Sequence, residues 1–177
     1  QYGMIYACAQ KNAGIAGVTV AIIRRDLLAR SPDNLPSMLD YRTFVEKGSR
    51  PNTPPVVAVY ILGLVCEWLM SEVGGLHAIS ERNAAKATKV YEVIDSSSGF
   101  YKGHACPESR SIMNVTFRLS SEDLEATFIK EAASEGLADL KGHRSVGGIR
   151  ASIYNAMPEE GVEALCQFMN DFKCSHG

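Results

Sequence analysis

The sequence lacks a charge surplus, a long apolar run and a patterned set of cysteines. Lys and Arg number 18 against 20 Asp and Glu, so the formal net charge is -2 and no general field attracts nucleic acid or an anionic membrane. The longest apolar run, residues 56–66, stops at Glu67, well short of the ~20 residues that span a bilayer. We therefore expect small ligands, local anion sites, and neither nucleic acid nor a membrane as a partner.

The cysteines are an odd set of five without a CxxC pair: Cys8, Cys66, Cys106, Cys166 and Cys174. This pattern predicts free thiols in a reducing compartment such as the cytoplasm, and no metal site. Residues 1–10 lack the charged and apolar regions of a secretory signal. They have the pattern of the middle of a strand, so we expect further chain before them, where any organellar targeting peptide would lie.

The apolar fraction of 46% and the charged fraction of 21% are those of an ordinary globular protein with a substantial core. We find no internal repeat. Before residue 95, five prolines predict irregular structure over 31–55, and a polar face including Lys86 is predicted on the second long helix. The elements expected here are strands at 2–9 and 18–25, a helical turn at 26–30, and helices at 56–70 and 76–94.

After a break at 96–101 the pattern again predicts alternating strands and helices. Strands are expected at 113–119 and 148–155, and helices at 121–136 and 158–173. Ser121 is a predicted N-cap, and Pro158 stands at a predicted helix start. The overall prediction is an α/β fold of two parts, residues 1–94 and residues 95–177.

Lys11 is the single charge in ACAQKNAGIAGV, between apolar runs typical of buried sheet. Desolvation of such an amine lowers its pKa and frees it to attack a carbonyl carbon, which is Schiff-base chemistry. The alternative is a solvated loop lysine, with Gln10 and Asn12 as ordinary loop amides. The spacing alone does not decide between them.

Two further segments are candidate anion sites. LKGHRSVGGIR at 140–150 places His143, Arg144 and Arg150 among three glycines. Glycines allow close backbone approach to an anion, and arginine matches phosphate or carboxylate oxygens. RPNTPP at 50–55 places Asn52 and Thr53 before a helix, where free N–H groups bind phosphate. The alternatives are a solvated basic turn and simple helix capping.

One other pair of residue types is weighed as catalytic. His104 and Cys106, in YKGHACPES, could act as a Cys/His nucleophile pair, but no third group that would orient the histidine is evident. Trp68 is expected in the core, and no Walker loop or dinucleotide-binding glycine turn is present.

AQKN, NTPP and KGHRSVGGIRAS, in this order and at these separations, resemble the C-terminal half of the phosphoserine aminotransferases. These are pyridoxal phosphate (PLP) enzymes of class V and fold type I. The resemblance covers essentially the whole chain. It implies the end of a large PLP-binding α/β domain followed by a small α/β domain with a short sheet and covering helices.

The resemblance also implies a role for each candidate residue. Lys11 would carry PLP as a Schiff base and move the proton, Gln10 would lie near the cofactor phosphate, and Asn52 and Thr53 would reach the cofactor phosphate of a neighbouring subunit in a homodimer. His143 and Arg144 would bind the substrate phosphate, and Arg150 the α-carboxylate. The implied reaction moves an amino group from glutamate to 3-phosphohydroxypyruvate, giving O-phosphoserine and 2-oxoglutarate in serine biosynthesis.

The family's N-terminal half, with the ring-stacking aromatic, the aspartate that pairs with the pyridine nitrogen and the glycine-rich phosphate loop, has no counterpart in this sequence. We therefore expect a fragment that is inactive alone, or one that works with a separate N-terminal chain. Two alternatives remain: another class V enzyme, such as a cysteine desulfurase using Cys106, or a non-catalytic module that binds anions or dimerises.

Overall fold

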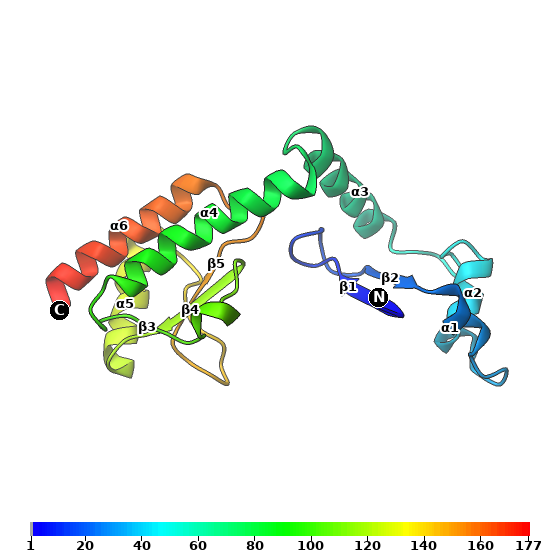
Figure 1. Cartoon of the computed structure of the whole chain (residues 1–177), viewed down its shortest axis with the longest axis horizontal. Coiled ribbons are helices and arrows are strands. Elements are labelled where there is room, and N and C mark those ends of the chain that lie inside the picture. The colour runs from blue at the N-terminus through cyan, green and yellow to red at the C-terminus, as the bar shows by residue number, and fades with distance from the viewer. Residues whose placement is uncertain (1) are drawn as a thin grey trace. The chain divides into compact units, whose positions relative to one another are not determined.

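The computed structural model describes residues 2–177 (Figure 1). The chain divides into two compact units, one ending at Val73 and one running from Gly74 to Gly177. This division precedes the helix that the sequence assigned to the first domain, so it differs from the predicted boundary after residue 94. The reason is that this helix, α4 (Gly75–Asp95), packs along α6 (Glu159–His176) in the second unit.

The first unit begins with an antiparallel hairpin. Strands β1 (Met4–Cys8) and β2 (Thr19–Ile23) pair from Met4 with Ile23 to Cys8 with Thr19. Both strands were predicted, but every residue of β1 and nearly all of β2 is exposed. The expectation of buried sheet around Lys11 is therefore wrong for residues 2–177, where β1 and β2 pair only with each other.

The proline-containing segment is more ordered than predicted. It follows α1 (Arg25–Ala29) and contains the short helices η1 (Ser37–Leu39) and α2 (Tyr41–Glu46). Asp40 caps α2 by accepting a hydrogen bond from the Arg42 backbone N–H at 2.9 Å, and Arg42 also pairs with Asp33. An aspartate cap and its arginine therefore stabilise a helix that the prolines had obscured.

Helix α3 (Val56–Ser71) completes the first unit and contacts the β1–β2 loop. A Cβ at Gly14 would lie 3.4 Å from Ile61, and one at Gly17 would lie 3.5 Å from the Cβ of Ala58. The predicted core residue Trp68 is half-buried. The buried apolar residues of this unit are only Ala9, Ala58 and Val73 among those described, so the unit has almost no hydrophobic core of its own.

The second unit is a three-stranded antiparallel sheet with helices on one face. The strands are β3 (Lys102–Gly103), β4 (Asn114–Arg118) and β5 (Ile149–Ser152), in the order β3-β4-β5. The short helix η2 (Pro107–Ser109) and helix α5 (Glu122–Ser134) complete it. Ser121 caps α5 by accepting from the Leu124 N–H, and α6 begins directly after Pro158, as predicted. The sequence missed only the very short β3 and η2.

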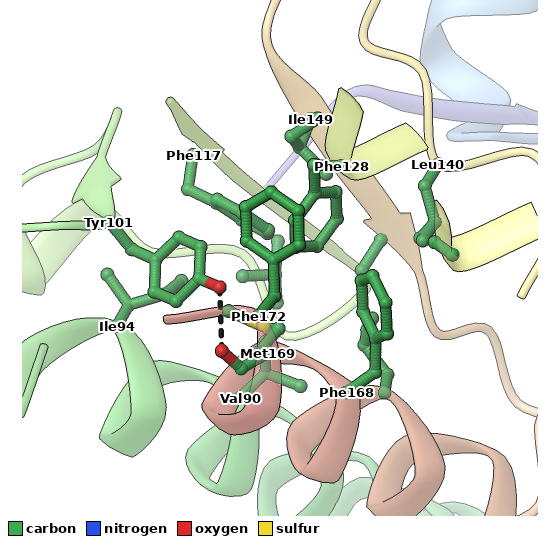
Figure 2. Packing of buried hydrophobic residues seen from close by; sticks show 14 of the residues in the cluster. Val90, Ile94, Tyr101, Phe117, Phe128, Leu140, Ile149, Phe168, Met169 and Phe172 are labelled. Atoms are coloured by element: carbon green, nitrogen blue, oxygen red, sulfur yellow. Dashed lines mark hydrogen bonds between the residues drawn. The ribbon is translucent and has the colours of Figure 1, made fainter. Parts of the chain in front are cut away.

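A cluster of aromatic rings forms the core between the sheet and the helices (Figure 2). The Phe128 ring lies edge to face with Phe117, Phe168 and Phe172, with centroids 5.8, 5.0 and 5.0 Å away. Tyr101 is buried beside them and donates its hydroxyl proton to the Met169 carbonyl oxygen at 2.7 Å (Figure 2). Edge-to-face packing adds to the free energy of burial, so this unit has a complete core.

Lys86 is fully buried, so its predicted place on a polar helix face is wrong. Its ammonium donates to the carbonyl oxygens of Tyr154 at 2.7 Å and Met157 at 3.0 Å. The buried Asn83 amide donates to the Asn155 side chain at 2.7 Å. Burial lowers the pKa of Lys86, with the positive charge of Arg82 acting in the same direction. Helix α4 thus holds the segment that follows β5.

Three further properties bear on function. All five cysteines are free, as predicted. Within residues 2–177 we find no group of three or more His, Cys, Asp or Glu side chains that could hold a metal ion. No single helix of the described chain is long and apolar enough to cross a membrane, and only α3 and α4 taken together across their break meet that length and composition.

Candidate functional site

Lys11 lies in the turn that follows β1, and its side chain is exposed. Its backbone N–H and that of Ala13 both donate to the Ala9 carbonyl oxygen, at 2.6 and 3.3 Å. Ala9 is buried, and its own N–H donates to Val18 across the hairpin. The hairpin therefore fixes the Lys11 backbone while leaving the amine accessible, and Gln10 is exposed beside it.

Asn52 and Thr53 are exposed four and three residues before α3 begins. Neither side chain caps the helix: no side-chain cap bond is present, and the Asn52 amide donates to the Thr53 carbonyl oxygen at 3.2 Å. The capping alternative is therefore wrong. The first-turn N–H groups of α3, as in any α-helix, have no intrahelical acceptor, and no side chain caps them; this is the arrangement that binds anions at helix N-termini.

Residues 141–148 form a tight loop closed by glycines. A Cβ at Gly142 would lie 2.0 Å from the Gly147 carbonyl oxygen, and the Gly142 N–H donates to the Gly148 carbonyl oxygen at 2.7 Å. The Gly147 N–H donates to the His143 carbonyl oxygen at 2.7 Å. These glycine N–H groups close the loop, so here they do not face an anion as the sequence suggested.

Of the two predicted substrate residues on this loop, His143 lines a cavity and Arg144 does not. The His143 ring accepts from the Ser145 N–H at 3.3 Å, and its Nδ1 lies 2.7 Å from the Ser145 hydroxyl. His143 and Arg150 both line a cavity of about 150 Å³. Arg144 is exposed on the same loop but is not among the residues that line the cavity.

Arg150 is held by the sheet. It stands opposite Thr116 in the β4–β5 pairing, and its N–H donates to the Leu140 carbonyl oxygen at 2.8 Å. The side-chain Nε is buried and has no hydrogen-bond partner among the described residues. A buried guanidinium N–H without a partner is costly, so Arg150 is suited to an incoming carboxylate or phosphate.

One cavity residue, Arg118, was not predicted from the sequence, and another, His104, was considered only as a partner of Cys106. Arg118 and His104 line the same cavity as Arg150 and His143, and the His104 N–H donates to the Thr116 carbonyl oxygen at 3.2 Å. Residues 114, 116 and 118 alternate with the buried Val115 and Phe117. This alternation in the sequence could have placed Arg118 on the open face of the sheet beside Arg150.

The structure groups the candidates by unit. The first unit contains Gln10, Lys11, Asn52 and Thr53, and the β1–β2 loop that follows Lys11 packs on the helix that follows Asn52 and Thr53. The second unit contains His143, Arg144 and Arg150. One unit thus offers an exposed lysine on a fixed turn, and the other offers a cationic cavity with an arginine Nε that is buried and has no hydrogen-bond partner among the described residues.

The family model described as aminotransferase class-V matches residues 1–165. The chain belongs to the class-V aminotransferase family. Its relatives include the phosphoserine aminotransferases of Rhodopirellula baltica, 57% identical over 97% of this chain and 46% of the relative, and of Geobacillus kaustophilus, 58% identical over 98% of this chain and 48% of the relative.

Solved structures agree with these sequence comparisons. The phosphoserine aminotransferase of Bacillus circulans subsp. alkalophilus superposes with a TM-score of 0.96 and 53% identity, covering 99% of this chain and 48% of the other. PLP-bound phosphoserine aminotransferase from Trichomonas vaginalis gives a TM-score of 0.89 at 44% identity, covering 95% of this chain and 48% of that one. The predicted fold, the C-terminal part of a class V aminotransferase, is confirmed.

The chain spans about half the length of the relatives it matches. Apolar residues of the hairpin, including Ile5 and Tyr6, are exposed in the described chain. No other part of the first unit packs against them closely enough to bury them, which agrees with a chain that spans only part of its relatives.

Proposed function

We propose that this chain forms the C-terminal half of the active site of a PLP-dependent phosphoserine aminotransferase. The reaction is the transfer of an amino group from glutamate to 3-phosphohydroxypyruvate, giving O-phosphoserine and 2-oxoglutarate in serine biosynthesis. The observation that carries the proposal is the 57–58% identity to phosphoserine aminotransferases over almost the whole chain. The cationic cavity around Arg150 supports it, because both ends of phosphoserine are anionic.

The residues of the first unit fit PLP. Lys11 supplies an accessible amine on a fixed turn, and α3 supplies uncapped first-turn N–H groups next to Asn52 and Thr53. We assign Lys11 to the aldehyde carbon, Gln10 to the phosphate of the cofactor in its own site, and Asn52 and Thr53 to the phosphate in the neighbouring site. PLP, when bound, supplies the electron sink for breaking the bond from the substrate Cα to its proton.

Lys11 then acts as the base. Its Nζ would take up the proton from the substrate Cα and hold it for return. Such a role needs an amine that is unprotonated for part of the cycle. The exposed apolar residues of β1 and β2 are positioned to receive the neighbouring strands of a complete sheet around Lys11.

The second unit recognises the substrate. Arg150 pairs with the α-carboxylate through its planar fork, and His143 and Arg144 hold the phosphate or the γ-carboxylate of glutamate. Fixing both anionic ends restricts the orientation of the bound substrate, and such positioning can supply a large part of a rate enhancement.

We further propose a homodimer with shared active sites, assembled with an N-terminal half on the same or a separate chain, in the cytoplasm. Five free thiols support a reducing compartment. The nearly coreless first unit supports the need for additional structure around the hairpin. The 177 residues alone are then inactive, because the ring-stacking and pyridine-pairing groups lie in the other half.

The alternatives make different predictions. A cysteine desulfurase needs Cys106 as its nucleophile; Cys106 is exposed, but it is not among the residues lining the cavity with His104. Alkylation of Cys106 without loss of activity excludes that reaction. A non-catalytic module is favoured by the separate core of the second unit, and it would bind phosphate esters without reacting with PLP.

The test is a graft. Residues 1–177 replace the matching half of the Geobacillus kaustophilus enzyme, and amino transfer from glutamate to 3-phosphohydroxypyruvate is measured. Borohydride reduction followed by peptide mapping identifies the modified lysine. The expected result is turnover with a pyridoxyl group on Lys11. The control is the same graft with Lys11→Ala, which should fold but show no turnover. A pyridoxyl group on another lysine, or turnover by the free 177-residue chain, contradicts the proposal.

A further inference from the structure

Arg118 is an arginine of the cavity to which the proposed reaction assigns no role. It lies at the end of β4, and its Nη2 donates to the carbonyl oxygen of Val146, at the tip of the 141–148 loop. Its Nη1 lies 3.7 Å from Oε1 of Glu125, a carboxylate that is only 9% exposed. Arg118 therefore connects the loop to helix α5.

Glu125 is itself fixed. Its Oε1 accepts a hydrogen bond from the Leu119 N–H at 3.3 Å, and it lies in the first turn of a helix capped by Ser121. A carboxylate held in this way restricts the guanidinium next to it, as outer residues orient the inner ones around many sites. The arginine is thus fixed from the side opposite the loop.

The loop fits closely under the arginine. A Cβ at Gly147 would lie 3.1 Å from Nη2 of Arg118, and one at Gly148 would lie 3.3 Å from its Cγ. Both glycines have positive φ, at 74° and 73°. The two glycines allow the Arg118 side chain to lie across the backbone and reach the Val146 carbonyl.

This contact acts on the residues proposed to bind substrate. The N–H groups of Val146 and Gly147 donate to the His143 carbonyl oxygen at 2.9 and 2.7 Å, so Val146 belongs to the same turn as His143 and Arg144. Gly142 and Gly148 tie the base of the loop, and Arg118 ties its tip. Without Arg118, the tip of the loop would be held only by the hydrogen bonds of its own turn, from Val146 and Gly147 to His143.

We propose that Arg118 is a positioning residue that holds the 141–148 loop so that His143 and Arg144 meet the phosphate or γ-carboxylate of the substrate. This inference rests on the proposed function for the identity of the ligand, but the ordering of the loop stands on the contacts of Arg118 alone. Arg118 acts through the Val146 carbonyl and the loop backbone, and therefore affects binding more than the chemical step.

The first experiment measures amide hydrogen exchange in the 177-residue chain. Arg118→Met removes the donor but keeps an unbranched side chain, and Val146 is 49% exposed, so water can replace the lost bond and the unit stays folded. Exchange at the Val146 and Gly147 N–H groups should quicken about tenfold, the equivalent of one charge-assisted hydrogen bond. Exchange at Phe128 and Phe168 in the core should be unchanged.

The matched control is Arg82→Met, which removes an exposed arginine from α4 of the same unit. It should leave the exchange of Val146 and Gly147 unchanged. Equal exchange at these amides in the Arg118→Met and unsubstituted chains overturns the proposal. A second variant, Arg118→Lys, keeps the charge and one donor, and should give an intermediate rate.

The second experiment uses the grafted enzyme. Arg118→Met should raise the KM for O-phosphoserine about tenfold and change kcat less than about threefold, with Arg118→Lys restoring part of the KM. A fall in kcat at constant KM overturns the positioning role. A graft without any turnover contradicts the proposed function instead, and the exchange measurement then decides the role of Arg118 by itself.

Discussion

The buried Lys86 ammonium donates to the Tyr154 carbonyl oxygen at 2.7 Å, joining the middle of α4 to the segment that follows β5. The Met157 carbonyl accepts a second bond from the same nitrogen. A lysine without an exposed end normally needs a partner to offset its desolvation, and here two main-chain oxygens supply it. The segment that connects β5, the strand containing Arg150, to α6 is therefore held by one side chain of α4, a helix that is distant in the sequence.

Lys86→Met should lower the free energy of unfolding of the second unit by about 3 kcal/mol, because two buried carbonyl groups lose a charged donor. Urea denaturation followed by circular dichroism measures this. The control is Lys89→Met, three residues along α4, where the lysine is 35% exposed and pairs with Glu159 and Glu163. Surface pairs contribute less than about 1 kcal/mol, so equal losses at the two positions would refute the role of Lys86.

Gly142→Ala should destabilise the second unit by about 1–3 kcal/mol, because the new Cβ would overlap the carbonyl oxygens of Gly147 and Gly148. The variant should also weaken binding of phosphate esters, since the loop that carries His143 must open. Thermal denaturation and titration with O-phosphoserine check the two effects.

The control for this substitution is Gly161→Ala in α6. There the nearest atom to a new Cβ is Sδ of Met157, at 2.9 Å, which is the flexible end of a side chain and can move. Alanine is also the better helix former. We expect no loss of stability from Gly161→Ala, and a loss as large as that of Gly142→Ala would show that crowding at the loop is not the cause.

Sequence patterns predicted the elements of the second unit well because local signals agree there. Ser121 before an acidic turn and Pro158 before two glutamates mark the helix starts, and β4 alternates buried and half-buried residues. Lys86 could not be predicted, because helical periodicity places it on a face but cannot show that Tyr154 and Met157 present carbonyls there. Its acceptors lie 68 and 71 residues further along the chain.

The candidate site was predicted only in part, for a related reason. The arginines and glycines of 140–150 identify an anion site through their chemistry, but the glycine N–H groups are used within the loop. Lys11 was identified by its isolation between apolar runs. The burial that those runs predict is absent in the described chain, because strands β1 and β2 pair only with each other.

A pH dependence should arise from Arg110 and Asp95. The guanidinium donates to both carboxylate oxygens at 2.7 and 2.6 Å, and these bonds lower the pKa of Asp95 below its ordinary value of 3.8. The ordinary value applies when the chain is unfolded, so the pair stabilises the fold above about pH 4 and its contribution is lost as pH falls through the lowered pKa.

Asp95→Asn should therefore flatten the acid limb of the stability curve and leave stability near pH 7 only slightly reduced, because the carboxylate is half exposed. Urea denaturation at pH 2.5 to 7 provides the comparison, with Asp171→Asn on α6 as the control for loss of one aspartate. If the fall in stability at acid pH is the same in Asp95→Asn as in the unsubstituted chain, the Asp95–Arg110 pair is not its cause.

The two units should differ in their ability to fold alone. Residues 74–177 contain the whole aromatic cluster and all but three of the buried apolar residues, the exceptions being Ala9, Ala58 and Val73. Expressed separately, they should unfold cooperatively, because a domain of this size with its own core normally does. Residues 1–73 should give no cooperative transition, since their hairpin and α3 expose Ile5, Tyr6 and Tyr60.

Near-ultraviolet circular dichroism and urea titration of the two segments test this difference. If residues 74–177 fold and bind O-phosphoserine while residues 1–73 do not fold, the anion site is independent of the lysine-bearing unit, and the hairpin requires the N-terminal half of the enzyme for its core. Cooperative folding of residues 1–73 alone would instead mean that the exposed apolar faces of β1 and β2 need no partner. The hairpin around Lys11 would then not require further strands from the N-terminal half.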